Sequence, residues 1–236
     1  MTAASQDASS SGVRAIPTSP LAAGAAALRR FWRPFLLIQA AAAGLALAYR
    51  ASPAFRAACA TAAGWKVAGG LPFAAATGAF AGGILPELAK LMTDRGRSRE
   101  PGRAGAVLFN IAFFAFNGMV IDLLYRGEAV LFGRDASVRT VIEKVAFDQF
   151  VFTPSWSALI VTLFLWRARG FSFAAVRPEL RSGFYRARVV PLLIPNFLFW
   201  IPMVSIVYAL PVPLQFLLFI PALAAWSLIM VFIASR

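Results

Sequence analysis

The segment AFDQFVFTPSWSALIVTLFLW, residues 146–166, decides the fold class of this chain. It is apolar over the length of about 20 residues that a helix needs to cross a bilayer. A carboxylate and an amide, Asp148 and Gln149, nevertheless stand near its start, shortly before Pro154. Polar side chains within a membrane span are costly in lipid, so they usually face the bundle interior or a water-filled cavity. The segment therefore predicts a membrane helix with a polar inner face.

Further apolar segments lie on both sides of this one. The segment 35–49 is short for a span, so it crosses only if flanking residues contribute. Prolines in the last two segments fit membrane helices, where neighbouring groups satisfy the freed carbonyls. The sequence therefore predicts an all-α, polytopic transmembrane helix bundle over residues 31–236. Its spans are expected near residues 35–49, 67–88, 104–125, 146–166, 189–210 and 211–234.

The composition supports a membrane location. Apolar residues make up 60% of the chain, charged residues 14%, and the mean hydropathy is +0.71, whereas soluble domains contain about 25% charged residues. The net charge of +13 could indicate a nucleic-acid partner. However, the arginines cluster in short segments between apolar runs, as in loops that flank membrane spans. We therefore expect the lipid bilayer, and no nucleic acid, as a partner.

The charge distribution predicts an orientation in the membrane. Loops 90–103 and 167–188 belong to the side with more Lys and Arg, and loop 126–144 belongs to the other side. The positive-inside rule then places both termini on the cytoplasmic side. The Ser- and Ala-rich segment 1–30 is predicted to be a disordered or targeting tail. The Ala- and Arg-rich composition favours a bacterial inner membrane, with a mitochondrial or peroxisomal membrane as the alternative.

Residues that usually carry enzyme chemistry are scarce in the sequence. The chain has no His, which removes imidazole catalysis and His-bound metal or haem. Cys59 is the single cysteine, so it has no partner for an internal disulfide. The sequence contains no nucleophile–base pair, phosphate-binding glycine loop or metal-ligand spacing. We therefore predict no enzyme activity, no cofactor and no metal site.

Small residues recur every four positions in the predicted span 67–88. They are Gly70, Ala74, Gly78 and Gly82, which share one helix face. Small side chains at this spacing let two membrane helices approach closely. We predict a helix-packing interface at this face, and a pore lining is the alternative.

Polar side chains inside the predicted spans form two arcs and one single position. Such groups either line a water-filled path or join helices through hydrogen bonds. Both interpretations stay open at this point, and the residues concerned are candidates for either role. They are Asn110, Asn117 and Asp122 in one span, Asp148 and Gln149 in the next, and Asn196 in a later one.

The surroundings of Asp148 predict a polar cluster at a helix kink. Lys144 lies one helical turn earlier on the same face, so we expect its ammonium to reach the carboxylate. Pro154 has no N–H for the carbonyl of Phe150, which leaves an acceptor near Gln149. We predict that these groups make a structural cluster that also borders a permeation path.

The stretch KVAFDQFVFTP, residues 144–154, closely resembles a stretch of the Mpv-seventeen/peroxisomal membrane protein family. The family pattern has a Lys, then Asp-Gln, then a Pro six residues after the Asp, and Lys144, Asp148, Gln149 and Pro154 match it. Family members are small integral proteins, mostly with four membrane helices, in mitochondrial inner and peroxisomal membranes. The resemblance therefore implies four spans here, with one or two additional apolar segments.

Two other segments take part in the resemblance, which covers about two thirds of the chain. Upstream, GMVIDLLYR keeps the family's Gly and Tyr as Gly118 and Tyr125, with Asp122 at a position that is often His. The family's Pro and Trp in this segment are replaced by Met and Leu. Downstream, Asn196 and the Phe that follows it are similar to the family's Asn-Phe pair. No catalytic residues come with the family.

The function that the resemblance implies is channel-like passage of small solutes or metabolites. The first alternative is a non-conducting structural or scaffolding membrane protein, in which the same polar groups only hold helices together. A membrane enzyme acting on lipid or quinone is the second, and the lack of His counts against it. The expected partners are the bilayer and an unidentified small solute, and a homo-oligomer is compatible with each function.

Overall fold

The computed structural model describes residues 20–93, 102–181 and 183–234, and within these ranges the secondary structure is helical, without strands. This confirms the predicted all-α class. Residues 1–19 of the predicted tail 1–30 lie outside the described residues. Its remainder belongs to the first helix, α1, which begins at Pro20.

The helices follow one another with few connecting residues. Three continuous helical stretches contain a wide, π-type turn, labelled η. They are α2–η1–α3, α5–η3–α6 and η4–α8. The elements are α1 (Pro20–Ala51), α2 (Pro53–Gly78), η1 (Ala79–Ile84), α3 (Leu85–Thr93), α4 (Arg103–Leu131), α5 (Val138–Phe147), η3 (Asp148–Phe152), α6 (Thr153–Ala168), α7 (Phe173–Val176), η4 (Tyr185–Val189), α8 (Val190–Tyr208) and α9 (Val212–Ala234).

Four helical stretches in the described part of the chain are long and apolar enough to cross a membrane. They are Pro53–Met92, Arg103–Leu131, Val138–Ala168 and Tyr185–Tyr208, with shorter apolar helices at Phe35–Ala51 and Val212–Leu228. The predicted bundle of four spans with additional apolar segments is therefore confirmed. The segment predicted at 211–234 is one of the shorter apolar helices over the residues that the structure describes.

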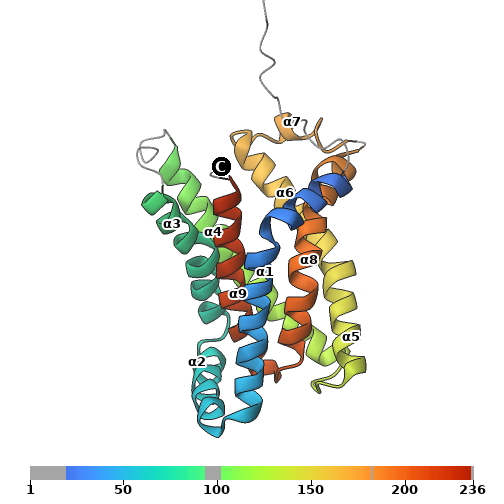
Figure 1. Cartoon of the computed structure of the whole chain (residues 1–236). Coiled ribbons are helices and arrows are strands. Elements are labelled where there is room, and N and C mark those ends of the chain that lie inside the picture. The colour runs from blue at the N-terminus through green and yellow to red at the C-terminus, as the bar shows by residue number, and fades with distance from the viewer. Residues whose placement is uncertain (1–19, 94–101, 182, 235–236) are drawn as a thin grey trace, which may run out of the picture.

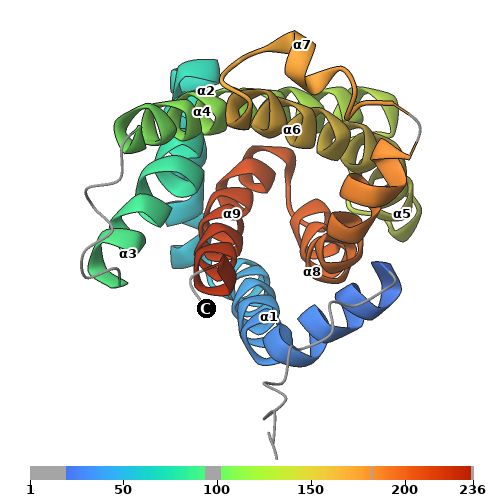
Figure 2. The ribbon, with the colours of Figure 1, turned by 90° about the horizontal axis from the view of Figure 1, so that it is seen from above.

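Helices α8 and α9 occupy the middle of the bundle. Seen from above, α2, α4, α6 and α5 form an arc around α8 and α9, and α1 lies across the open side of the arc (Figure 2). Helix α1 packs mainly on α8, and α9 contacts α2, α3 and α4. The largest of the fully buried apolar side chains come from these central helices, among them Phe199, Met203 and Phe216.

The connections alternate between the two ends of the bundle (Figure 1). The end of α3, helix α7 and the C-terminal end of α9 lie at one end. The α1–α2 corner and the α4–α5 loop lie at the other. The Arg-rich connection after α6 therefore lies opposite the α4–α5 loop, in the alternation that the sequence predicts. Which end faces the cytoplasm stays a prediction.

Each π-type turn in the described chain ends two residues before a proline. Proline has no N–H, and its ring crowds the carbonyl four residues earlier. In each case the residue before the proline bonds instead to the carbonyl five positions back, which widens the turn. The predicted kink at Pro154 thus takes the form of η3, which contains Asp148 and Gln149. The bonds join Leu85 to Phe80 before Pro86, Thr153 to Asp148 before Pro154, and Val190 to Tyr185 before Pro191.

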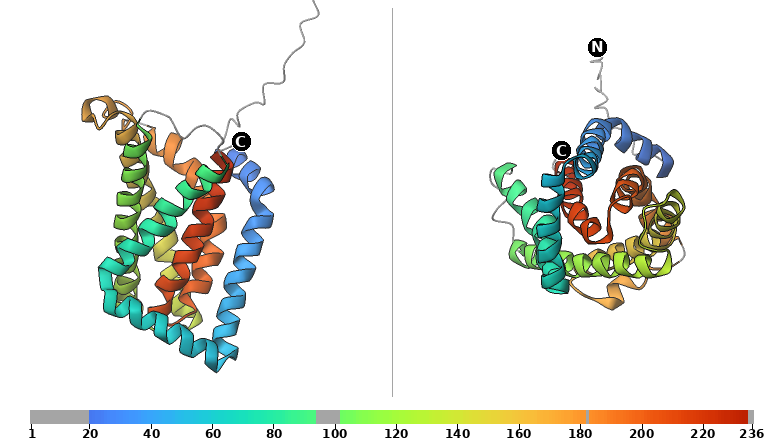
Figure 3. Two further views of the ribbon diagram at one scale, coloured as in Figure 1. Left: turned by 90° about the vertical axis from the view of Figure 1, so that its left-hand side faces the viewer. Right: turned by 90° about the horizontal axis from the view of Figure 1, so that it is seen from below.

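Helix α2 is divided by a corner at Gly70. This residue has φ +52°, a conformation that favours glycine, and Pro72 follows it. The first limb of α2 lies across one end of the bundle, and the second limb runs along it beside α4 (Figure 3). The corner brings Lys66, on the first limb, close to α4.

Candidate functional site

A cavity of about 480 Å³ lies between α4, α6, α8, α9 and the η1–α3 segment. The less buried end, called the outer end here, is lined by Glu87, Lys90 and Asn110. The opposite, deeply buried end, called the inner end, is lined by Tyr125 and Asp148. Asn110 and Tyr125 lie roughly 22 Å apart along α4, at 1.5 Å per residue. The inner end is deeply buried, with Tyr125 3% and Asp148 5% exposed. The cavity therefore follows the long axis of the bundle.

Most of the polar candidates from the sequence meet at this cavity. Asn117 accepts a hydrogen bond from the indole N–H of Trp156 at 2.9 Å, which joins α4 to α6. The side-chain oxygens of Asn110 and Gln149 are buried and have no hydrogen-bond partner among the described residues. The candidates on the cavity wall are Asn110, Asn117, Tyr125, Asp148, Gln149 and Asn196.

Asp148 is held by hydroxyl groups. Its Oδ2 accepts a hydrogen bond from the Tyr208 hydroxyl at 2.9 Å, and its Oδ1 accepts one from Thr153 Oγ1 at 3.4 Å. The bond to Tyr208 joins η3 to the last turn of α8. The ring of Tyr208 also meets the ring of Tyr125 edge to face at 5.5 Å. Two tyrosine rings and a carboxylate thus close the inner end of the cavity.

Lys144 does not form the expected ion pair with Asp148 in the part of the chain that the structure describes. Its ammonium lies 5.8 Å from the centroid of the Tyr208 ring and has no hydrogen-bond partner among the described residues. Lys144 and Glu128 are both buried, and the side-chain nitrogen of the first and the oxygens of the second have no hydrogen-bond partner among the described residues. The expectation was wrong because the Lys144 ammonium lies against the Tyr208 ring of α8 instead.

Aromatic side chains form much of the remaining wall. Phe152 and Trp156 stack at 5.7 Å between ring centroids. On the central helices, Trp200 lies 5.6 Å from Phe219 and 6.3 Å from Trp226, again between ring centroids. All five rings line the cavity, so it combines aromatic faces with a small number of polar groups.

Asp122 lies outside the cavity wall, in an ion-pair network. It is fully buried and pairs with Lys66 from α2 and with Arg126 at 2.6 Å. The lysine reaches it because the corner at Gly70 turns the first limb of α2 toward α4. A path-lining role for Asp122 is therefore corrected to one in joining two helices.

The small-residue face of α2 and η1 lies against α4. A Cβ added at Gly78 would come within 2.5 Å of the Phe114 carbonyl oxygen, and one at Gly82 would meet the Phe114 ring. A Cβ at Gly118 would meet the carbonyl of Ala74. Gly118 thus belongs to this contact, outside the cavity wall.

Gly70 does not share the helix contact, because a Cβ there would meet nothing within 4 Å. Its positive φ gives it a role in the corner of α2, so its assignment to the packing face is corrected. Pro154 likewise stays off the cavity wall and starts α6 after the wide turn.

Glu128 and Tyr208 contribute to the inner end, and sequence reasoning missed both. The apolar run of α4 ends before Arg126, so Glu128 was assigned to a loop, whereas the helix continues to Leu131. No sequence pattern around Tyr208 indicates its role, because its partner Asp148 is 60 residues away in sequence.

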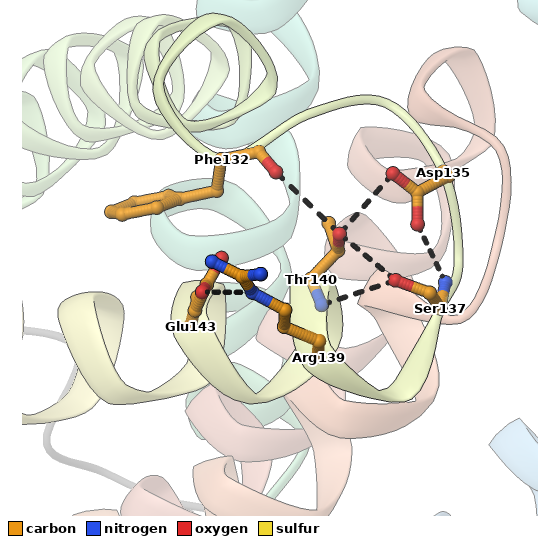
Figure 4. A network of polar contacts seen from close by, with 6 residues as sticks. All are labelled: Phe132, Asp135, Ser137, Arg139, Thr140 and Glu143. Carbon is orange, nitrogen blue, oxygen red and sulfur yellow. Dashed lines mark hydrogen bonds and ion pairs between the residues drawn. The ribbon is translucent and has the colours of Figure 1, made fainter.

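The α4–α5 loop next to this end is ordered by its own hydrogen bonds (Figure 4). Asp135 Oδ1 accepts from the Ser137 N–H at 2.9 Å, and its Oδ2 accepts from the Thr140 hydroxyl at 3.2 Å. The Phe132 carbonyl, 3.5 Å from the same Thr140 hydroxyl, is the alternative acceptor for its single proton. Hydrogen bonds from Ser137 and Thr140 lower the pKa of Asp135 from 3.8 to about 2. The loop therefore fixes the start of α5, which carries Lys144.

Together these features define an all-α bundle of membrane-spanning length with a polar and aromatic cavity inside it. Comparison with known proteins adds no relative, since no family model, curated protein or solved structure matches the chain. The resemblance to the Mpv-seventeen family stays an expectation from the motif around Asp148.

Proposed function

We propose that this protein is an integral membrane protein through which small solutes pass by way of the cavity. The observation that carries the proposal is a polar-lined cavity of about 480 Å³ along the axis of a bundle with helices of membrane-spanning length. Polar groups inside a membrane usually face such water-filled spaces. The motif shared with the Mpv-seventeen family, whose members are described as channel-like, supports the same conclusion. The proposal involves no catalysis and no cofactor.

Passage requires the inner end to open. In the state described, Tyr125, Tyr208 and Asp148 close it, and the ammonium of Lys144 lies against the Tyr208 ring. We propose that movement of the Tyr208 ring away from Asp148 opens the path. A structural, non-conducting protein is the alternative, favoured by the hydrogen bond between Asn117 and Trp156 that ties two wall helices together.

The membrane proposed is a bacterial inner membrane, with a mitochondrial or peroxisomal membrane as the alternative. The outer end of the cavity lies at the Arg-rich end of the bundle, which the positive-inside rule assigns to the cytoplasm. In a Cys59→Ser background, Arg177→Cys and Arg134→Cys place single thiols at exposed positions on opposite ends. An impermeant reagent outside the cell is expected to label only the thiol at position 134. Labelling of both positions from one side contradicts this orientation.

Solute passage is tested with purified protein in liposomes. Ser157 lines the cavity, whereas Ser155, on the same helix, is exposed. Ser157→Trp fills the cavity, and Ser155→Trp adds the same ring on the outside. The solutes are a panel of small polyols, amino acids and amines. We expect the unmodified protein and Ser155→Trp to let members of this panel enter, and Ser157→Trp to reduce entry at least about tenfold. Entry no faster than into protein-free liposomes would falsify the channel-like function and leave the structural alternative.

A further inference from the structure

The charges on the cavity wall do not balance at its inner end. Glu87 at the outer end pairs with Lys90 at 2.5 Å and with Arg103 at 3.7 Å. Asp148 at the inner end has hydroxyl partners and no ion pair with Lys or Arg among the described residues. The buried ammonium of Lys144 lies 5.8 Å from the centroid of the Tyr208 ring and has no hydrogen-bond partner among the described residues. The inner end therefore holds a buried carboxylate without its own counter-charge.

The hydrogen-bonding groups left over on the wall are acceptors. Gln149 is 2% exposed, and its side-chain oxygen has no donor among the described residues. The side-chain oxygen of Asn110, nearer the outer end, is in the same situation. A buried acceptor without a donor is costly, and a buried charge without a counter-charge more so. A bound molecule with N–H donors and a positive charge would therefore satisfy both the free acceptors and the carboxylate of the wall.

Aromatic rings surround the same space. Indole faces attract cations through their ring quadrupole, and the effect is strongest where water is excluded. Trp156, Trp200 and Trp226 all line the cavity, and Phe152 stacks on the first of them. A carboxylate set among such rings favours a cation over an anion. It also disfavours a neutral polyol, which leaves the charge of Asp148 uncompensated.

We propose that the cavity binds a small protonated amine, whose ammonium group donates to Asp148 and Gln149 and lies against the tryptophan faces. This inference rests on the proposed function, because it names the class of solute that the path accepts. An amine fits better than a quaternary ammonium ion, which has a charge and no N–H donor for Gln149.

The test measures binding directly, so it does not depend on transport. Calorimetric titration of the purified protein in nanodiscs compares ethylammonium, tetramethylammonium, ethanol and acetate. We expect saturable binding of ethylammonium, weaker binding of tetramethylammonium, and none of the alcohol or the anion. No saturable binding of ethylammonium, or equal binding of ethanol, overturns the inference, and this comparison requires no variant.

A variant pair assigns the site. Asp148→Asn keeps the shape and can still accept from Tyr208, but it removes the charge, so ethylammonium binding is expected to weaken at least about tenfold. Glu143→Gln removes one negative charge from the exposed face of α5 and should leave binding unchanged. Equal affinities in the unmodified protein and Asp148→Asn overturn the assignment. Amine binding without solute entry into liposomes would refute the permeation function and leave the binding site in place, whereas solute entry without amine binding does the reverse.

Discussion

The hydroxyl of Tyr208 donates a hydrogen bond of 2.9 Å to the carboxylate of Asp148, and this bond joins α8 to the wide turn η3. Both residues are deeply buried, 1% and 5% exposed. The bond thus connects the central helices to the surrounding arc at the point where the cavity ends. A residue from the family-like motif and one from outside it thus close the inner end of the cavity together.

Tyr208→Phe removes this bond while keeping the ring beside Lys144 and Tyr125. A buried acceptor that loses its donor destabilises a fold by about 1–3 kcal/mol. We expect the free energy of unfolding in detergent to fall by that amount, measured by denaturant titration. Tyr185→Phe is the matched control, since Tyr185 is exposed, and it should change little. Equal effects of the two substitutions mean that the buried bond contributes nothing to stability.

Gly78→Ala and Gly64→Ala are expected to act in opposite directions. At Gly78 the added methyl meets the Phe114 carbonyl at 2.5 Å, so α2 and α4 must separate, at a cost of about 1–3 kcal/mol. At Gly64 it meets nothing within 4 Å, and the helix gains about 0.5–1 kcal/mol. Melting temperatures in detergent measure both changes. A Gly78→Ala protein as stable as Gly64→Ala rules out close packing at this face.

Lys66→Met leaves Asp122 buried with Arg126 as its remaining partner. Removing one member of a buried pair typically costs about 3–5 kcal/mol, and the remaining cation, Arg126, should keep the loss below that range. The double variant Lys66→Met, Asp122→Leu removes both charges and should recover part of the stability. A double-mutant cycle on unfolding free energies measures the coupling, and additive losses would show that the two residues do not interact.

Asp135 makes the start of α5 sensitive to acid. Its pKa is lowered from 3.8 to about 2 in the folded protein, so its contribution to stability is complete above pH 4 and is lost as the pH falls toward 2. Carbon NMR of the Asp135 carboxyl group should give a midpoint near 2. Thr140→Val removes the hydroxyl that donates to Asp135 Oδ2 and should raise the midpoint toward 3.8. An unchanged midpoint in that variant would exclude Thr140 as a cause of the lowered pKa.

The sequence predicted the class of fold and the core of each long helix, because apolar length is a local property. It misplaced the end of α4, since Arg126 and Glu128 interrupt the apolar run although the helix continues through them. Asp122, which Arg126 pairs with, is also bound by Lys66 from another helix, and Glu128 is buried. Hydropathy reads composition along the chain and contains no information about such partners.

The candidate site was predicted in part for the same reason. Helical spacing identified Asn110, Asn117 and the Asp148–Gln149 pair as inward-facing groups, and they line the cavity. Spacing also suggested Lys144 as the partner of Asp148, whereas the actual partner is Tyr208, far away in sequence. Gly70 matched the four-residue repeat of the packing face, but its positive φ is a backbone property that the repeat does not encode.

The wide turn η3 has a consequence for how Asp148 and Trp156 come to share one cavity. A π-type turn holds one more residue than an α-helical turn would, so every side chain after it is rotated by roughly 100° relative to those before it. Asp148 lies at the start of the turn and Trp156 after it, on either side of that rotation. Which walls they face is therefore fixed by the number of residues between them as much as by their chemistry. The number of residues in Asp148–Phe152 therefore sets the relative orientation of the side chains before and after the turn, so an inserted or deleted residue there would turn Trp156 away from the cavity.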